Sequence, residues 1–550
     1  MDSFDYIIIG AGTAGCVLAN RLSKDPQNRV LLVEAGGKDD YFWINIPVGY
    51  LYTINNPRTD WCYTTEAEPG LNGRSIGYAR GKGLGGCSSI NAMIYMRGQR
   101  SDYDHWAALG NRGWSWDEVL PVFKLSEDYQ HGADDFHGEG GELRVEERRV
   151  NWPILDAWRQ AAAETGIPKI EEFNRGDNFG NSYFQVNQKR GTRWSGTRGF
   201  LRPVLDRPNL VVMTQAQVLK INTQQVAGET RATGIQLRTR SNPLVETINA
   251  RREVILAAGA INSPQLLQVS GIGPAELLKA HEIDVVHDLP GVGENLHDHL
   301  QVRIVYKVSN TRTLNQRMNS LFGKAMMGLE YLLFKTGPLT MPPSQLGAFA
   351  RSDADQVTPN IEWHVQPLSL DKFGEPLHRF NAITPSVCNL RPTSRGHVRI
   401  KSQDASVYPS ITLNYLATPE DQKVAIEGIK FTRKIMQADA LSPYAPQEYL
   451  PGMQVQTDAE LLAAAGDLGA TIFHPVGTCK MGDDPLAVVN DRLQVHGVAA
   501  LRVIDASIMP RITSGNTNAP TVMIAEKGAT FILEDARANM AMSAHSKPQT

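Results

Sequence analysis

The chain has 550 residues, with 55 Lys and Arg against 58 Asp and Glu and a formal net charge of −3. Such a length gives room for a large enzyme of two interleaved domains. The balanced charge gives no indication of nucleic acid or an anionic membrane as the main partner. Five widely spaced cysteines without a C-x-x-C pair argue against a disulfide framework or a zinc site, so we expect no bound metal.

The start of the chain predicts an intracellular protein. Met1–Ser3 leads directly into an apolar run, which leaves no room for a signal peptide. No apolar run approaches the length of about 18 residues that a membrane-spanning helix needs. We therefore expect a cytoplasmic protein without a transmembrane segment. The sequence does not decide whether the protein also associates peripherally with a membrane.

The first forty residues predict a dinucleotide-binding unit. A β-branched run at 4–9 precedes glycines in G-x-G-x-x-G spacing at Gly10, Gly12 and Gly15, and helical apolar spacing follows over 16–22. Glycine at these positions permits a tight turn, close approach of a pyrophosphate and packing of the helix on the strand. The phosphates would lie at the helix N-terminus.

An acidic residue completes this unit. The strand predicted over 29–33 is followed by Glu34, nineteen positions after Gly15. A carboxylate there accepts hydrogen bonds from a ribose 2′-hydroxyl and repels a 2′-phosphate, so NADP is disfavoured. This unit alone does not show whether the bound dinucleotide is NAD or FAD.

Later segments predict more strands of the same nucleotide-binding domain, separated by insertions. These strands are expected at 211–215, 217–221, 233–237, 252–259 and 501–507, with a helix over about 521–533. The insertions contain alternating apolar and polar residues, as in Asn360–Val365, which is typical of an antiparallel sheet with one covered face.

We therefore expect an α/β protein built from two interleaved domains. A Rossmann-like domain would comprise residues 1–150, 196–300 and 465–540. An antiparallel-sheet substrate domain would comprise 151–195 and 301–464, and 541–550 would form a frayed tail.

A second glycine cluster follows at 80–93, where four glycines in seven residues precede small polar side chains. Backbone amides in such a loop reach phosphates or a flat ring without obstruction by Cβ atoms. The apolar run after the loop, over 93–96, indicates a fixed position rather than a flexible linker.

These motifs resemble those of the glucose–methanol–choline (GMC) oxidoreductases, which bind FAD. The two signatures of that family are matched at 80–98 and 259–273, and further resemblance lies at 290–299, 474–478 and 516–521. The resemblance covers nearly the whole chain. Within the family, the chain most resembles bacterial choline-dehydrogenase-like proteins and alcohol dehydrogenases and oxidases.

The resemblance implies a set of FAD contacts. Gly10, Gly12 and Gly15 would face the pyrophosphate, Glu34 the adenosine ribose, and Val218 the adenine through its backbone. The flavin ring would be bordered by Gly86, Asn91, Ala92, Met93, Asp505 and Ala506. The remaining expected contacts are Thr13, Ala14, Ala35, Arg80, Ala258, Gly259, Pro520 and Thr521.

One position bears on how FAD is held. Some family members attach FAD covalently through a histidine in the first signature, and this chain has Ile90 at the matching position. An aliphatic side chain cannot form that bond. We therefore expect non-covalent FAD.

Alcohol oxidation by hydride transfer needs a base for the hydroxyl proton and a group that holds the oxygen, whereas flavin supplies the redox chemistry. Neutral histidine suits the first task because its unperturbed pKa of about 6.5 lies near working pH. Among 13 histidines, the resemblance selects His474 as the base and Asn518 as its oxygen-orienting partner. Phe473, beside the base, is the expected substrate contact.

His297 and His299 have spacing that suits metal ligands, but the resemblance makes them structural or flavin-neighbouring. The expected function is oxidation of an aliphatic or aromatic primary alcohol to the aldehyde, with oxygen or a quinone-type acceptor. The two alternative functions are those of a choline dehydrogenase and of an FAD-containing hydroxynitrile lyase. Neither the alcohol, the acceptor nor the oligomeric state follows from the sequence.

Overall fold

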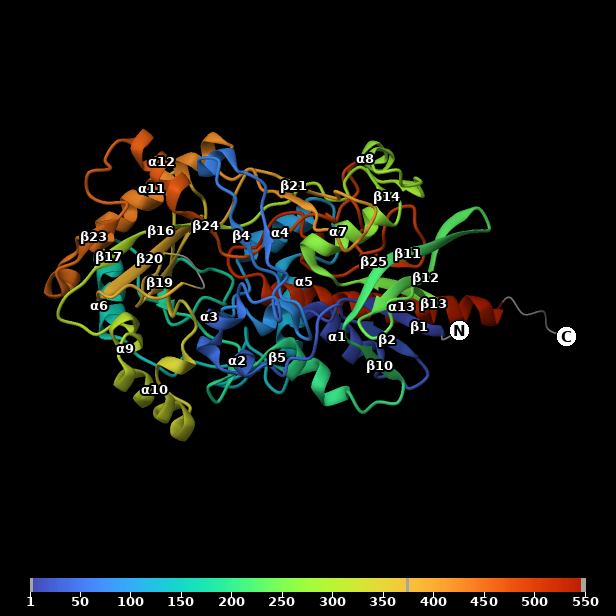
Figure 1. The fold of residues 1–550 in the computed structure, drawn as a ribbon, viewed down its shortest axis with the longest axis horizontal. Helices are drawn as coiled ribbons and strands as arrows, with labels where there is room; N and C mark the ends of the chain where they lie inside the picture. The colour runs from blue at the N-terminus through green and yellow to red at the C-terminus, as the bar shows by residue number, and fades with distance from the viewer. Residues whose placement is uncertain (1–2, 372–374, 546–550) are drawn as a thin grey trace.

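Two large sheets form the body of the protein. The computed structural model describes residues 3–371 and 375–545. A seven-stranded sheet lies in one half of the molecule and an eight-stranded sheet in the other, and the chain crosses between them several times (Figure 1). This arrangement confirms the expected α/β fold.

The seven-stranded sheet has the order β10-β2-β1-β13-β12-β11, and β25 also pairs with β13. Its central strands are parallel and buried on both faces, which explains their continuous Ile, Val and Leu runs. The strands are β1 (Ser3–Ile9), β2 (Val30–Val33), β10 (Leu210–Met213), β11 (Ala216–Val226), β12 (Glu229–Thr239), β13 (Glu246–Leu256) and β25 (Leu501–Val503).

Helices from both ends of the chain cover this sheet together. α1 (Thr13–Leu22) packs against α13 (Asn518–His545). Arg21 on α1 bonds Glu526 on α13 at 2.7 Å and Glu142 at 2.5 Å, so one guanidinium joins three distant segments. α7 (Gly259–Val269) follows β13 directly.

The eight-stranded sheet is antiparallel, as the alternating segments predict. Helices α6 (Pro153–Glu164), α11 (Pro419–Met436) and α12 (Asp458–Leu468) lie against it. Its strands are β7 (Gly180–Tyr183), β16 (Leu300–Arg303), β17 (Val305–Lys307), β18 (Leu346–Ala350), β19 (Ile361–Gln366), β20 (Ala382–Asn389), β23 (Gln447–Leu450) and β24 (Gly469–Thr471).

The two faces of this second sheet differ in polarity. Trp363 and Val365 of β19 belong to an apolar core, whereas the alternate residues Glu362, His364 and Gln366 point to the opposite face. Because Glu362 pairs in register with Cys388 and Cys388 with Gln301, the polar residues of three strands share that face. Polar side chains thus line the inner side of the sheet.

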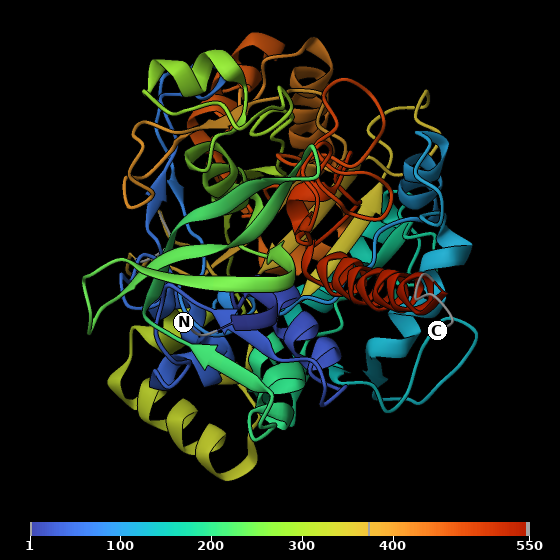
Figure 2. The same cartoon turned by 90° about the vertical axis from the view of Figure 1, so that its right-hand side faces the viewer.

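The other elements connect and flank the sheets. They include α2 (Phe42–Asn45), α3 (Tyr50–Thr53), α4 (Arg100–Ala108), α5 (Trp116–Ser126), α8 (Ala275–Ala280), α9 (Leu314–Met318) and α10 (Leu321–Phe334). Figure 2 shows the β11–β12 hairpin reaching outward from the first sheet and α10 projecting at the edge of the molecule. Within the described residues no helix has the length and apolarity needed to cross a membrane.

Three expected boundaries differ from the structure. β24 pairs with β16, so residues 469–471 belong to the antiparallel sheet, although the sequence places 465–540 in the other domain. α13 begins at Asn518 and reaches His545, well beyond 533 and into the expected tail. Residues 546–550 of that tail lie outside the described residues.

Candidate active site

A pocket lies between the two sheets. It is lined by the carboxyl ends of β1, β2 and β13, by the glycine loop at 79–94, by 472–475, by 516–518 and by polar side chains of β16 and β19. Crevices beyond the carboxyl ends of parallel strands are the usual ligand sites of such sheets. The pocket therefore connects the dinucleotide-type motif with the polar face of the second sheet.

The N-terminus of α1 opens into this pocket. Gly12 is the N-cap, and no side chain caps the helix. A Cβ placed on Gly12 would have Ala257 O, 3.9 Å away, as its nearest neighbour, so this glycine faces open space. Uncapped amides at a helix start form an anion site suited to a pyrophosphate.

Gly15 has a different role from the one that the resemblance implies. A Cβ there would lie 1.9 Å from Gly10 O, so the residue must be glycine for α1 to pack against the end of β1. Gly15 does not line the pocket, whereas Gly10 and Gly12 do. It supports the phosphate loop without facing it.

Glu34 ties three backbone segments together. Its carboxylate accepts hydrogen bonds from the N–H groups of Ala11 at 2.9 Å, Gly36 at 2.8 Å and Gly83 at 2.9 Å. Burial raises the pKa of Glu34, and the three N–H donors act in the opposite direction. The residue lines the pocket as expected, and it also joins the first glycine turn to the second glycine loop.

The second glycine loop crosses directly over the first. A Cβ on Gly86, whose φ is +50°, would lie 2.7 Å from Gly12 Cα. Only glycine permits this contact. All the other expected cofactor residues except Pro520 line the pocket, namely Thr13, Ala14, Ala35, Arg80, Asn91, Ala92, Met93, Val218, Ala258, Gly259, Asp505, Ala506 and Thr521.

His474 is held by contacts on both ring nitrogens. Its Nδ1 lies 3.1 Å from Nδ1 of His299, and its Nε2 lies 3.0 Å from Nδ2 of Asn516. His299 Nε2 lies 3.1 Å from the carbonyl oxygen of Leu390. His474 and Asn516 line the pocket, and His299 lies behind them.

These contacts fix the proton positions. A carbonyl oxygen only accepts, so neutral His299 donates from Nε2 to Leu390 and keeps a lone pair on Nδ1. His474 must then donate from Nδ1, which leaves the lone pair of His474 on Nε2. The pocket-lining histidine is therefore set up as a base at Nε2.

The asparagine that contacts His474 is Asn516 and not Asn518. Asn518 is the first residue of α13, and its Oδ1 accepts a hydrogen bond from Thr13 Oγ1 at 2.8 Å. It lines the pocket but joins the starts of α1 and α13. The structure thus places Asn516, and not Asn518, in contact with His474, and the oxygen-orienting role of Asn518 stays a prediction.

A buried carboxylate positions the two histidines. Asp298 Oδ1 accepts hydrogen bonds from the backbone N–H of His299 at 2.8 Å and of His474 at 2.7 Å. Its Oδ2 accepts from Tyr78, Tyr415 and Thr471. Sequence reasoning missed Asp298, although it stands between the two histidines of the 296–300 motif.

His297 has a structural position. Its Nδ1 lies 2.6 Å from Asn295 O, and its Nε2 accepts from the backbone N–H of Ile512 at 2.9 Å. Both ring nitrogens are thus used within the protein, and burial lowers the pKa of His297 well below 6.5.

The backbone before His474 adopts an unusual conformation. Phe473 lines the pocket and has a φ of +68°, which is rare for a bulky residue. Arg80 Nη2 donates to Phe473 O at 2.5 Å, and Phe473 N donates to Thr471 Oγ1 at 2.7 Å. The strained turn is thereby held in place and directs His474 toward the pocket.

Burial lowers the pKa of His474 well below 6.5. Repulsion acts in the same direction, from His299 and His364 when they are protonated and from Arg80. Burial also lowers the pKa of His299, while the carboxylates of Glu362 and Asp298 oppose that shift. Both imidazoles are therefore neutral at pH 7, as the proton positions above require.

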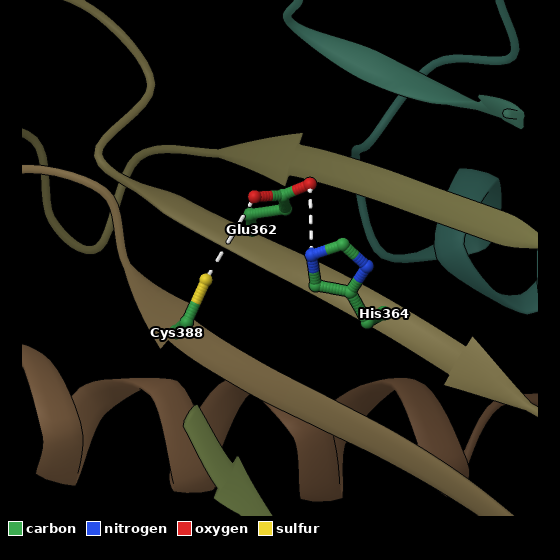
Figure 3. Close-up of side chains that lie close together, drawn as sticks. All are labelled: Glu362, His364 and Cys388. Carbon is green, nitrogen blue, oxygen red and sulfur yellow. Dashed lines mark hydrogen bonds and ion pairs between the residues drawn. The ribbon is translucent and has the colours of Figure 1, made fainter. Parts of the chain in front are cut away.

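Three potential metal ligands lie together on the polar face of the second sheet (Figure 3). Cys388 Sγ lies 3.8 Å from Glu362 Oε2, and His364 Nε2 lies 3.2 Å from Glu362 Oε1. All three ligand atoms lie within 4.8 Å of one another. Burial raises the pKa of Cys388 well above 9, so it is a thiol that donates to Glu362. No sequence motif points to this cluster, and the absence of a metal stays a prediction.

Around His474 the described lining residues include the cation Arg80 but no carboxylate. Among the described residues that line the pocket, the carboxylates are Glu34 and Asp505. Asp505 already accepts hydrogen bonds from Gly259 N, Ser263 Oγ and Ser507 N. Apart from Arg80 and His364, the lining on this side is aromatic, aliphatic or uncharged and polar, with Ile94, Gln301, Ser344, Gln366, Ile472 and Phe473.

Comparison with known proteins agrees with this geometry. Two sequence models described as GMC oxidoreductase match residues 4–301 and 392–525. An alcohol dehydrogenase [acceptor] of Pseudomonas putida is 41% identical over 533 residues, which cover 96% of each chain. An oxygen-dependent choline dehydrogenase of Brucella ovis is 40% identical over 531 residues, which cover 96% of this chain and 95% of that one.

Solved structures show the same fold. A variant of the formate oxidase of Aspergillus oryzae, solved in a study of its FAD modification, superimposes with a TM-score of 0.90 at 27% identity. The match covers 98% of this chain and 99% of that one. With family matches over most of its length and relatives at about 40% identity, this chain belongs to the GMC oxidoreductases, the family of FAD-dependent enzymes that its motifs resemble.

Proposed function

We propose that the protein oxidises an uncharged primary alcohol to the aldehyde, with non-covalent FAD as the hydride acceptor. The observation that carries the proposal is the fixed tautomer of His474, which lines the pocket and whose Nε2 lone pair accepts from Asn516 Nδ2 at 3.0 Å. Such a pair supplies the base and the oxygen-holding group that alcohol oxidation requires.

The residues of the pocket fit FAD. Gly12 faces open space at an uncapped helix start, and a Cβ placed on Gly259, whose φ is +84°, would meet no other segment within 4 Å. Both positions allow a ligand to lie against the backbone. When bound, FAD supplies hydride acceptance at its N5 atom.

The chain's own residues would handle the proton. His474 Nε2 takes the hydroxyl proton, and the imidazolium keeps its Nδ1–H bond to His299. Asn516 Nδ2, 3.0 Å from Nε2, lies where it can donate to the alcohol oxygen. Asp298 holds the backbones of both histidines in place by accepting hydrogen bonds from their N–H groups.

The lining favours a neutral alcohol over choline. A quaternary ammonium needs a carboxylate or an aromatic cage to replace its hydration. Neither pocket carboxylate is free for that purpose, since Glu34 lies at the dinucleotide loop and Asp505 is occupied by three donors. Aromatic residues do line the pocket, namely Tyr50, Trp61 and Phe473, so the preference for aliphatic and aromatic alcohols rests on the lack of a free carboxylate.

The test is anaerobic mixing of the holoenzyme with a panel of primary aliphatic alcohols, benzyl alcohol and choline. Loss of the yellow flavin absorbance with one of the neutral alcohols is expected, and the same panel is then assayed for hydrogen peroxide and for quinone or dye reduction. Preferential bleaching by choline would support the choline alternative. Cyanohydrin cleavage with the flavin remaining oxidised would support a lyase.

The base is tested by His474→Ala. FAD should still bind, because its contacts are spread over several distant segments. Flavin reduction in a single turnover should slow by about a hundredfold to ten-thousandfold, the usual contribution of a positioned base. A rate within a few-fold of the wild type, with FAD fully bound, would remove His474 from this role.

A further inference from the structure

Helix α10 (Leu321–Phe334) presents apolar side chains to the outside of the molecule. Leu321 is 86% exposed, Phe322 76%, Leu332 73%, Leu333 64% and Phe334 66%. In both Figure 1 and Figure 2 the helix lies at the edge of the molecule, with no other element beyond it. A contiguous apolar surface of this kind marks an interaction site.

The exposed residues form one face of the helix. At about 100° per residue, Leu321, Leu332, Leu329, Phe322 and Leu333 fall within a single arc of about 120°. The buried side chains, Met327 and Tyr331, lie on the opposite side. The orientation is the reverse of an ordinary surface helix, whose apolar face points to the core. We call the set Leu321, Phe322, Met326, Leu329, Leu332 and Leu333 the α10 patch; Phe334, the last residue of the helix, is exposed but lies outside this face.

The surrounding charge indicates the partner. In residues 310–336 the cations Arg312 and Lys324 are exposed, whereas Arg317 lies over the ring of Trp152 and Lys335 over the ring of Tyr331. The one acidic residue of this stretch is Glu330, whereas the whole chain has a formal charge of −3. A short helix with an exposed apolar face and nearby cations matches an interfacial membrane helix. A symmetric dimer through the same patch would instead bring these cations toward their own copies.

The inner side of α10 anchors the patch near the active site. Tyr331 packs with Ile46, Val48 and Tyr50, and its Oη donates to Gly191 O at 3.2 Å. Tyr50 also lines the pocket. The helix is therefore fixed to a wall of the pocket while its outer face stays uncovered.

We propose that the α10 patch docks on the surface of a lipid bilayer that contains anionic lipids, without crossing it. The apolar side chains enter the boundary between headgroups and acyl chains, and the exposed Arg312 and Lys324 contact the headgroups. The docked orientation turns the pocket wall that carries Tyr50 toward the bilayer. This proposal concerns where the protein sits and does not rest on the identity of the alcohol.

The test uses the FAD-loaded full chain and vesicles made of equal parts phosphatidylcholine and phosphatidylglycerol. Flotation with these vesicles is expected, with less in pure phosphatidylcholine and less at high salt. The double variant Leu332→Glu/Leu333→Glu should lose at least about tenfold in the bound fraction. Lys324→Gln should weaken binding to the anionic vesicles by about fivefold.

A matched control uses exposed apolar residues elsewhere. Leu244 and Val357 are 72% and 85% exposed, so Leu244→Glu/Val357→Glu makes the same chemical change away from the patch and should float like the wild type. FAD content and flavin reduction by a water-soluble alcohol check that every variant is folded. No flotation of the wild type, or equal loss in both double variants, would overturn the proposal. So would a dimer in solution that dissociates in Leu332→Glu/Leu333→Glu without any vesicle binding.

Discussion

His299 Nδ1 faces His474 Nδ1 at 3.1 Å, so one of two identical ring atoms must donate and the other must accept. The carbonyl of Leu390 decides which, because it takes the proton of His299 on the far side of the ring. A backbone oxygen that does not reach the pocket thus determines which nitrogen of His474 carries the lone pair.

This relationship makes His299 a positioning residue that can be tested. His299→Ala removes the acceptor for His474 Nδ1, and flavin reduction by alcohol is expected to fall by about tenfold or more while FAD stays bound. His299→Asn keeps a carbonyl acceptor in a similar place and should recover part of the rate. Stopped-flow reduction at several pH values is the measurement, since a merely structural role would not change the pH profile.

The two asparagines before and at the start of α13 should behave differently. Asn516→Ala removes the donor beside His474 and is expected to slow flavin reduction by about tenfold to a hundredfold with FAD retained. Asn518→Ala breaks the bond to Thr13 and should act mainly on FAD retention. Measuring both quantities in each variant separates the roles, and the reverse pattern would restore Asn518 as the partner of His474.

The pH dependence of flavin reduction should reflect the lowered pKa of His474. The base acts in its neutral form, and a pKa well below 6.5 means that this form persists as the pH falls through that value. Reduction is therefore expected to be constant from about pH 8 to 6.5 and to decline only in more acidic solution. An inflection at or above 6.5 in single-turnover reduction would contradict this, provided that flavin absorbance shows FAD still bound.

Replacement of Glu34 by Gln should weaken FAD binding by at least about tenfold. The amide puts an N–H donor where the carboxylate accepts from the N–H groups of Ala11, Gly36 and Gly83. Both glycine loops then lose part of their support. Titration of apoprotein with FAD measures the effect, and Glu229→Gln at the exposed tip of the β11–β12 hairpin is the control. Equal affinity in Glu34→Gln and the wild type would show that Glu34 has no part in FAD binding.

Non-covalent FAD is the last prediction. Ile90 lines the pocket where other members of the family carry the attaching histidine, and its side chain has no atom that could bond the flavin. Heat or acid denaturation should therefore release intact FAD into the supernatant. Yellow colour that stays with the precipitated chain would show a covalent bond through another residue.

Local signals predicted much of the dinucleotide site. The glycines at 10, 12 and 15, the acid at 34 and the loop at 80–93 are close in sequence to the strands and helix that position them, so their geometry follows from short-range rules. Pocket-lining positions such as Val218 and Asp505 came from the resemblance and not from any pattern.

The contacts around His474 could not be predicted in the same way. They depend on how segments far apart in the sequence are placed next to each other, and no local pattern shows that. Asn516 and Asn518 are two residues apart, and only the path of the chain into α13 decides which one meets His474. The alternation in β19 correctly predicted a strand of an antiparallel sheet, but both faces of this strand are buried and not one. Which partners Glu362 and His364 meet on the other face depends on the pairing with β20, about 25 residues later in the chain.

The contribution of distant segments to one pocket has a consequence for biosynthesis. Residues from Ile9 to Thr521 line the cavity, and Thr13 and Arg21 of α1 bond Asn518 and Glu526 of α13. A nascent chain emerging from the ribosome has no closed flavin site until the first turns of α13 have been added. We therefore expect stable loading with FAD only after α13 has been synthesised, and chains that terminate before this helix to retain little flavin.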